Sequence, residues 1–87
     1  MKFRITDHAV QEMERRQIPR QVLDEILAAP QQIVKSRGNR SVYQSQIVFS
    51  CGRMYLVRVV VDDTVDEPVV LTVYRTSRIS KYWRTEQ

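Results

Sequence analysis

His8 is the only histidine of the chain and the side chain best suited to acid–base chemistry near neutral pH. It falls in the first turn of a helix predicted over residues 8–17. At helical spacing His8, Glu12 and Arg16 lie along one edge of that helix, beside its apolar stripe. The side chain of a histidine at the margin of a core face can point into a cleft, so His8 is a candidate general acid or base. The alternative is a surface or capping histidine at the start of a helix.

A second set of candidates lies on two predicted strands, residues 54–62 and 69–75. Alternation places Arg58 on the mixed face of the first strand, and Thr72 and Tyr74 on one face of the second. Side by side, these three residues would line a polar cleft. The alternative is an arginine whose aliphatic stem covers apolar surface while its head reaches water.

The C-terminal part of the chain is basic and aromatic, with no acid from Tyr74 until Glu86. Lys and Arg number 14 against 10 Asp and Glu, a formal charge of +4, and most of the cations are arginines, whose planar fork suits phosphate. Aromatic rings between cations are typical of nucleic-acid contact through phosphates and stacking. A solvated tail and a patch for an acidic partner protein are the alternatives. The cations concerned are Arg75, Arg78, Lys81 and Arg84.

Composition excludes several classes of protein. With 43% hydrophobic and 28% charged residues, we expect one soluble domain, without a membrane-spanning segment and, lacking an apolar leader, in the cytoplasm. One cysteine and one histidine rule out a Cys- or His-rich metal site, and the acidic loop at 63–68 matches no cation-binding loop. Two glycines leave no Gly-rich phosphate loop, so we expect neither metal nor cofactor. Cys51, in a hairpin turn, has no neighbour that would activate it.

The remaining pattern predicts an α+β fold with the order β-α-α-β-β-β-β. A short strand at 3–5 and two amphipathic helices precede four strands, so two N-terminal helices should pack on a mostly antiparallel, twisted sheet. Simple alternation joins Tyr55, Val57, Val59 and Val61 as the face for the helices. In the last strand it puts Val69, Leu71, Val73 and Arg75 on one face, and Val70, Thr72 and Tyr74 on the other. Residues 79–84 should form a helical turn or an extended tail.

Two stretches resemble the bacterial DUF4258 family, a domain of unknown function. The opening Ile5–Ala9 with Met13, Arg16 and Ile18 resembles that family's His-Ala…Met-x-x-Arg-x-Ile start. Residues 58–61 and 70–74 resemble its closing strands, so the likeness covers about residues 3–83. The order of elements also resembles the RelE/ParE and BrnT toxins and, more distantly, the colicin D type of tRNase. The resemblance implies a single RelE-like domain over 3–83, with a tail at 84–87.

The same resemblance implies a metal-independent endoribonuclease of the toxin–antitoxin type, in which the ribose 2′-OH attacks the phosphate. His8 would be the general acid or base, Arg16 and Arg58 would stabilise charge on phosphorus, and Tyr74 would complete the catalytic set. Thr72 would line the cleft. The RNA backbone would follow Arg75, Arg78 and Lys81. The sequence departs from a paired acid and base, because Glu12 is the one acidic group predicted near His8.

Three functional hypotheses follow from these features. The first is the ribonuclease toxin, which depends on His8 and Arg58 converging on one pocket. The second is a non-catalytic module that binds RNA or a protein, and the third is a small structural domain. The expected partners are RNA and an acidic antitoxin-like protein, with the chain itself a monomer or a homodimer.

Overall fold

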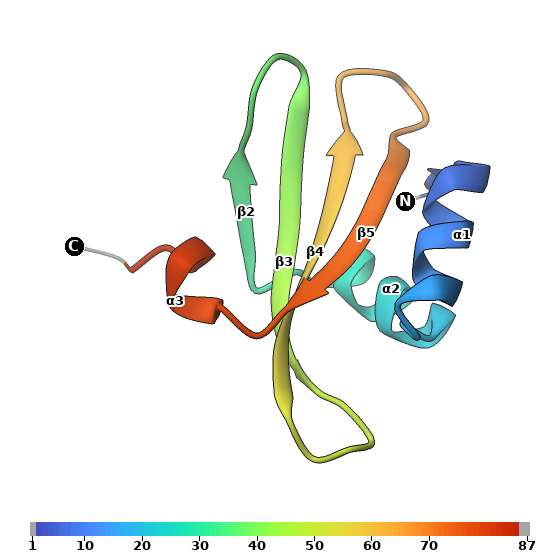
Figure 1. Cartoon of the computed structure of the whole chain (residues 1–87). Helices are drawn as coiled ribbons and strands as arrows, with labels where there is room; N and C mark the ends of the chain where they lie inside the picture. The colour runs from blue at the N-terminus through green and yellow to red at the C-terminus, as the bar shows by residue number, and fades with distance from the viewer. Residues whose placement is uncertain (1, 86–87) are drawn as a thin grey trace.

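The computed structural model describes residues 2–85 and contains a five-stranded sheet and three helices, which confirms the mixed α+β class (Figure 1). No helix in this part of the chain is long and apolar enough to cross a membrane. Of the predicted tail at 84–87, only the first two residues are described, and Glu86 lies outside the described residues. The elements run in the order β1 (Arg4–Ile5), α1 (Asp7–Arg15), α2 (Arg20–Ala28), β2 (Gln32–Lys35), β3 (Arg40–Val48), β4 (Met54–Asp62), β5 (Val69–Thr76) and α3 (Ile79–Tyr82).

The strands lie in the order β1-β5-β4-β3-β2. β1 runs parallel to β5, and every other neighbouring pair is antiparallel, as expected for consecutive strands joined by short turns. The backbone N–H of Arg4 donates to the carbonyl of Pro68 over 2.8 Å, and that of Thr6 donates to Val70 over 3.2 Å. These bonds hold the start of the chain against its last strand, so α1 begins beside β5.

Thr6 joins the start of α1 to an irregularity in β5. The register steps from Thr72 opposite Val60 to Val70 opposite Val61, so Leu71 is the extra residue of a β-bulge. The Thr6 hydroxyl donates to the carbonyl of Leu71 over 3.2 Å and accepts the N–H of Ala9 over 3.1 Å, which makes Thr6 the N-cap of α1. One hydroxyl therefore serves both the disturbed ladder and the first turn of the helix.

The bulge corrects one sequence prediction. Simple alternation separates Val70 from Val73, but both are fully buried in the same core because the extra residue reverses the alternation. Val69 is opposite Asp62 instead and lies outside that cluster. Nothing in the run of apolar residues 69–71 marks the position of a bulge.

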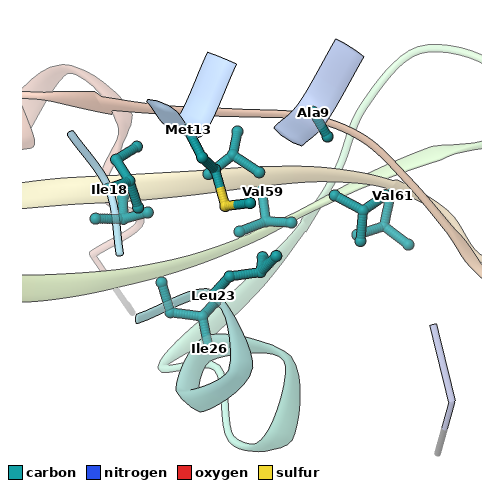
Figure 2. Packing of buried hydrophobic residues seen from close by; sticks show 10 residues of the cluster. Ala9, Met13, Ile18, Leu23, Ile26, Val59 and Val61 are labelled. Atoms are coloured by element: carbon teal, nitrogen blue, oxygen red, sulfur yellow. The ribbon is translucent and has the colours of Figure 1, made fainter. Parts of the chain in front are cut away.

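One hydrophobic cluster joins α1, α2, β4 and β5 (Figure 2). In the figure the side chains of Met13, Leu23 and Val59 point toward one another. The predicted apolar face of β4 is confirmed, since Val57, Val59 and Val61 are all fully buried. The full set is Ala9, Met13, Ile18, Leu23, Ile26, Val57, Val59, Val61, Val70 and Val73.

α1 ends at Arg15, two residues earlier than predicted. Gln17 has a φ of 56°, the left-handed conformation that usually follows a helix, and the N–H of Ile18 donates to the carbonyl of Met13 over 2.8 Å. This turn directs the chain into α2, whose first residue follows Pro19. It also leaves Arg15 and Arg16 at the end of α1 that points away from its Thr6 cap.

α3 lies against the other face of the sheet. Arg58 stands between Val57 and Val59 in β4 and so points away from the core that contains α1 and α2. The ring of Tyr82, in α3, lies 4.3 Å from the Arg58 guanidinium carbon. The short helical alternative for residues 79–84 is therefore confirmed, and it covers part of the face that carries Arg58.

We expect Ile26→Ala to lower the free energy of unfolding by about 2–5 kcal/mol, because the side chain is 1% exposed and a cavity would remain in the core. Ile33→Ala is the matched control, since Ile33 is 54% exposed and its loss should change stability by no more than about 0.5 kcal/mol. Urea unfolding followed by circular dichroism measures both. Equal effects of the two substitutions would contradict the position of the core.

Candidate functional site

A row of four polar side chains crosses the sheet on the face that carries α3. The register places Gln32 opposite Gln44, Gln44 opposite Arg58, and Arg58 opposite Tyr74. Arg58 donates through Nε to Gln44 Oε1 over 2.9 Å and through Nη1 to the Tyr74 hydroxyl over 2.6 Å. Gln44 Nε2 donates to Gln32 Oε1 over 2.8 Å. We call these four residues the polar row.

The polar row also holds the segment at and after α3. Gln44 Nε2 donates to the carbonyl of Tyr82 over 3.3 Å. The Gln32 amide donates to the Arg84 carbonyl over 2.6 Å and accepts the Arg84 N–H over 3.1 Å, as a neighbouring strand would. Gln44 is fully buried, and within residues 2–85 no buried side-chain nitrogen or oxygen lacks a partner. The row is thus a closed network, which is the condition for burying polar groups without a large penalty.

Three of the four predicted catalytic residues lie together at one end of this row. The guanidinium carbon of Arg16 is 6.0 Å from the centroid of the Tyr74 ring, and that of Arg58 is 5.8 Å from it. Arg16 comes from the end of α1 and reaches the side of β5. The predicted association of Arg58 with Tyr74 is therefore observed, and Arg16 joins them.

His8 is not part of that group in the described contacts. It is exposed in the first turn of α1, which begins beside Leu71, whereas Arg16 is at the other end of the helix. Eight residues of α-helix separate the two by about 12 Å along the axis.

Glu12 links the two ends of this helix edge electrostatically. The hydrogen bond from Arg16 Nε, 3.0 Å long, lowers the pKa of the Glu12 carboxyl, and the charges of Arg15, Arg16 and His8 lower it further against the opposing effect of desolvation. A carboxylate with a lowered pKa is a weaker proton acceptor. Glu12 is therefore better suited to orient the arginines than to act as a general base.

The four residues predicted to bind RNA are divided between the two faces of the sheet. Thr72 is half-buried opposite Val60, on the face of Tyr74. Arg75 lies on the other face, with its guanidinium carbon 4.4 Å from the Phe49 ring and 4.6 Å from the Tyr55 ring. Arg78 and Lys81 are exposed before and within α3. They do not form one line with Arg75.

The two ends of β4 and β5 differ in charge: acidic and basic residues are mixed at one end, where Arg40 is opposite Asp62 and Arg4 is opposite Val69, and arginines gather at the other. The acidic loop at 63–68 joins the end of β4 to the start of β5. The opposite ends of these two strands carry the basic residues, and the same end of the molecule receives the last turn of α1. We call this region the basic end; it comprises Arg15, Arg16, Arg53, Arg75 and Arg78. Within residues 2–85 no group of three or more His, Cys, Asp or Glu side chains is placed to hold a metal ion.

Several residues of this site were missed by sequence reasoning. Gln32 and Gln44 stand at matching positions of paired strands, but a glutamine in a strand is usually solvent-exposed, so only the register shows their role. The guanidinium carbon of Arg53, a residue of the hairpin turn before β4, lies 5.6 Å from the centroid of the Tyr55 ring. Its proximity to Tyr55, two residues later, was the available signal.

Arg58→Ala should lower the free energy of unfolding by about 2–3 kcal/mol, because it leaves the buried Gln44 oxygen without its charged donor. Arg53→Ala is the control: the same truncation, also of an arginine beside a tyrosine ring, should cost less than about 1 kcal/mol at an exposed site. Thermal and urea unfolding of the two variants gives the comparison. A loss for Arg58→Ala no greater than for Arg53→Ala would show that the polar row does not stabilise the sheet.

Comparison with protein families places the chain in one of them. Residues 5–75 match the family described as Domain of unknown function (DUF4258), and the chain belongs to that family. No curated protein and no solved structure matches the chain.

Proposed function

We propose that this DUF4258 protein binds single-stranded RNA through the basic end, in a RelE-like arrangement of helices and sheet. The observation that carries this proposal is the gathering of five arginines, from the end of α1, the turn before β4, β5 and the turn after β5, at one end of the sheet. At the other end the acidic loop lies beside Arg4 and Arg40, so opposite charges are mixed there. A surface of this kind attracts a polyanion and orients it toward one end of the protein.

The arginines retain donors for phosphate. A guanidinium has five N–H donors, and the hydrogen bonds of Arg15 and Arg16 to Glu12 each use one of them. Arg75 is supported by the rings of Phe49 and Tyr55, which fix the plane of the guanidinium and reduce the entropy lost on binding. Arg78 is exposed. Hydrogen bonds from these arginines would go to backbone phosphates, which bind a strand without reading its sequence.

The second candidate is the metal-independent endoribonuclease. It is favoured by the edge of α1 that carries His8, Glu12 and Arg16, because Arg16 reaches Tyr74. In that reaction a base removes the 2′-OH proton, the 2′ oxygen attacks phosphorus, and the leaving 5′ oxygen takes a proton. The Tyr74 hydroxyl accepts a hydrogen bond from Arg58, so its own proton is available to a leaving oxygen. The separation of His8 from Arg58 and Tyr74 favours binding over cleavage.

We expect Arg78→Gln to weaken the binding of a single-stranded RNA oligonucleotide about threefold or more and to reduce the slope of log K against log salt by about 0.7, the contribution of one phosphate contact. Fluorescence anisotropy at several salt concentrations measures both quantities. Arg37→Gln is the matched control, since it removes one exposed arginine from the turn between β2 and β3, near the acidic loop, and should leave both almost unchanged. Equal effects of the two substitutions would exclude the basic end as the binding surface.

The binding function further predicts that total RNA stays intact when incubated with purified protein in EDTA. Electrophoresis of the RNA, with wild type beside His8→Ala, provides the measurement. Cleavage by wild type that His8→Ala lowers about a hundredfold or more would establish the second candidate, because a general acid or base contributes about 10²–10⁴ in rate. Equal cleavage by both proteins would rule out His8 as the catalyst.

A further inference from the structure

A hollow of about 500 Å³ opens at the basic end between the last turn of α1 and the end of β5. Arg15, Arg16 and Gln17 line one side, and Arg75, Thr76 and Ser77 line the other, with Tyr55 of β4 beside them. No acidic residue lines it. We call this hollow the arginine pocket; it lies on the far side of β5 from Arg58.

The net charge of the arginine pocket matches a phosphate monoester. Glu12, just outside the lining, pairs with Arg15 over 3.1 Å and with Arg16 over 3.0 Å, so these two arginines and Arg75 together leave two positive charges uncompensated. A phosphate monoester carries roughly −1.5 to −2 at neutral pH, whereas each phosphodiester of an RNA backbone carries only one charge. The electrostatic attraction to this pocket is therefore stronger for a terminal phosphate than for an internal one.

Thr76 adds a neutral hydroxyl donor to the pocket. Its oxygen accepts the N–H of Arg78 over 3.1 Å, and a hydroxyl that accepts one hydrogen bond still has its own proton to donate. In the last turn of α1 the carbonyls of Glu12, Met13 and Glu14 accept the N–H groups of Arg16, Ile18 and Gln17. The attraction of the arginines for an anion therefore acts against only a partly exposed set of carbonyls at this helix end.

Gln17 stands where α1 ends and the pocket begins. Its φ of 56° is a conformation for which glycine is the usual residue, and a longer side chain is retained there at a cost of about 1 kcal/mol. Gln17 also lines the pocket, so its polar side chain adds to the lining that the arginines provide.

We infer that the arginine pocket binds the terminal phosphate monoester of an RNA strand, an inference that rests on the proposed function and narrows its ligand. The strand then continues over Arg78 and the rest of the basic end. The shared chemistry is the monoester dianion, which both a 5′ and a 3′ phosphate supply, and the experiment separates these two sources.

The test compares one oligoribonucleotide in three forms: with a 5′ phosphate, with a 3′ phosphate, and with hydroxyls at both ends. We expect one phosphorylated form to bind about tenfold more tightly than the hydroxyl form. A tenfold difference is about what one charge-assisted hydrogen bond contributes to affinity. In Arg15→Gln this preference should fall to about threefold or less. Arg20→Gln is the matched control, because Arg20 is a similarly exposed arginine paired with Asp24 within one helix, and it should keep the full preference.

A second measurement keeps the inference separate from RNA binding as such. Inorganic phosphate should shift the backbone amide resonances of Gln17 and Ser77, and Arg15→Gln should weaken that response. Equal affinity for all three RNA forms, or a preference that Arg15→Gln and Arg20→Gln keep alike, would overturn the terminal-phosphate inference while RNA binding stands. Phosphate shifts without any RNA binding would support the pocket as an anion site and would instead overturn the proposed function.

Discussion

The half-buried guanidinium of Arg58, in the polar row, constrains how the central strands of the sheet pair. Arg58 bonds to Gln44 in β3 and to Tyr74 in β5, so it joins three strands in one register. A shift of β3 by one residue would place Tyr43 or Ser45 opposite Arg58, and a shift of β5 would place Val73 or Arg75 there. Either shift would break one of the two hydrogen bonds of this half-buried cation, so the row favours the observed register as well as stabilising it.

A second constraint acts through the β-bulge at Leu71. The extra residue moves Val70 into the core and frees a backbone carbonyl, to which the Thr6 hydroxyl donates. Because Thr6 also caps α1, the bulge sets where the helix begins beside β5. The position of α1 in turn carries Arg15 and Arg16 to the basic end, and places His8 at the opposite end of the helix. Local backbone geometry in one strand thus decides which charged side chains from a distant segment become neighbours.

As a result of these two constraints, the side chains on the two faces of β5 have different surroundings. On one face Tyr74 belongs to a closed network that α3 and the segment after it cover. On the other face Arg75 rests on aromatic rings and opens into the arginine pocket. Arg16, at the edge, lines the pocket and also approaches the Tyr74 ring. A polyanion that bound along this edge would contact cations from both faces, and for this reason we place the proposed RNA surface at the end of β5 rather than in a central cleft.

The sequence by itself determined the α+β class, the positions of the turns, the core face of β4, and the pairing of Arg58 with the face of Tyr74. All of these depend on local periodicity and turn chemistry, which act over a few residues. Only the tertiary structure decided that Val70 is a core residue, that Gln32 and Gln44 share a network with Arg58, and that Arg16 rather than His8 lies beside Tyr74. These features depend on a bulge, on strand register and on the direction of α1 along β5. Each of them arises from contacts between segments far apart in the chain, for which local patterns contain no signal.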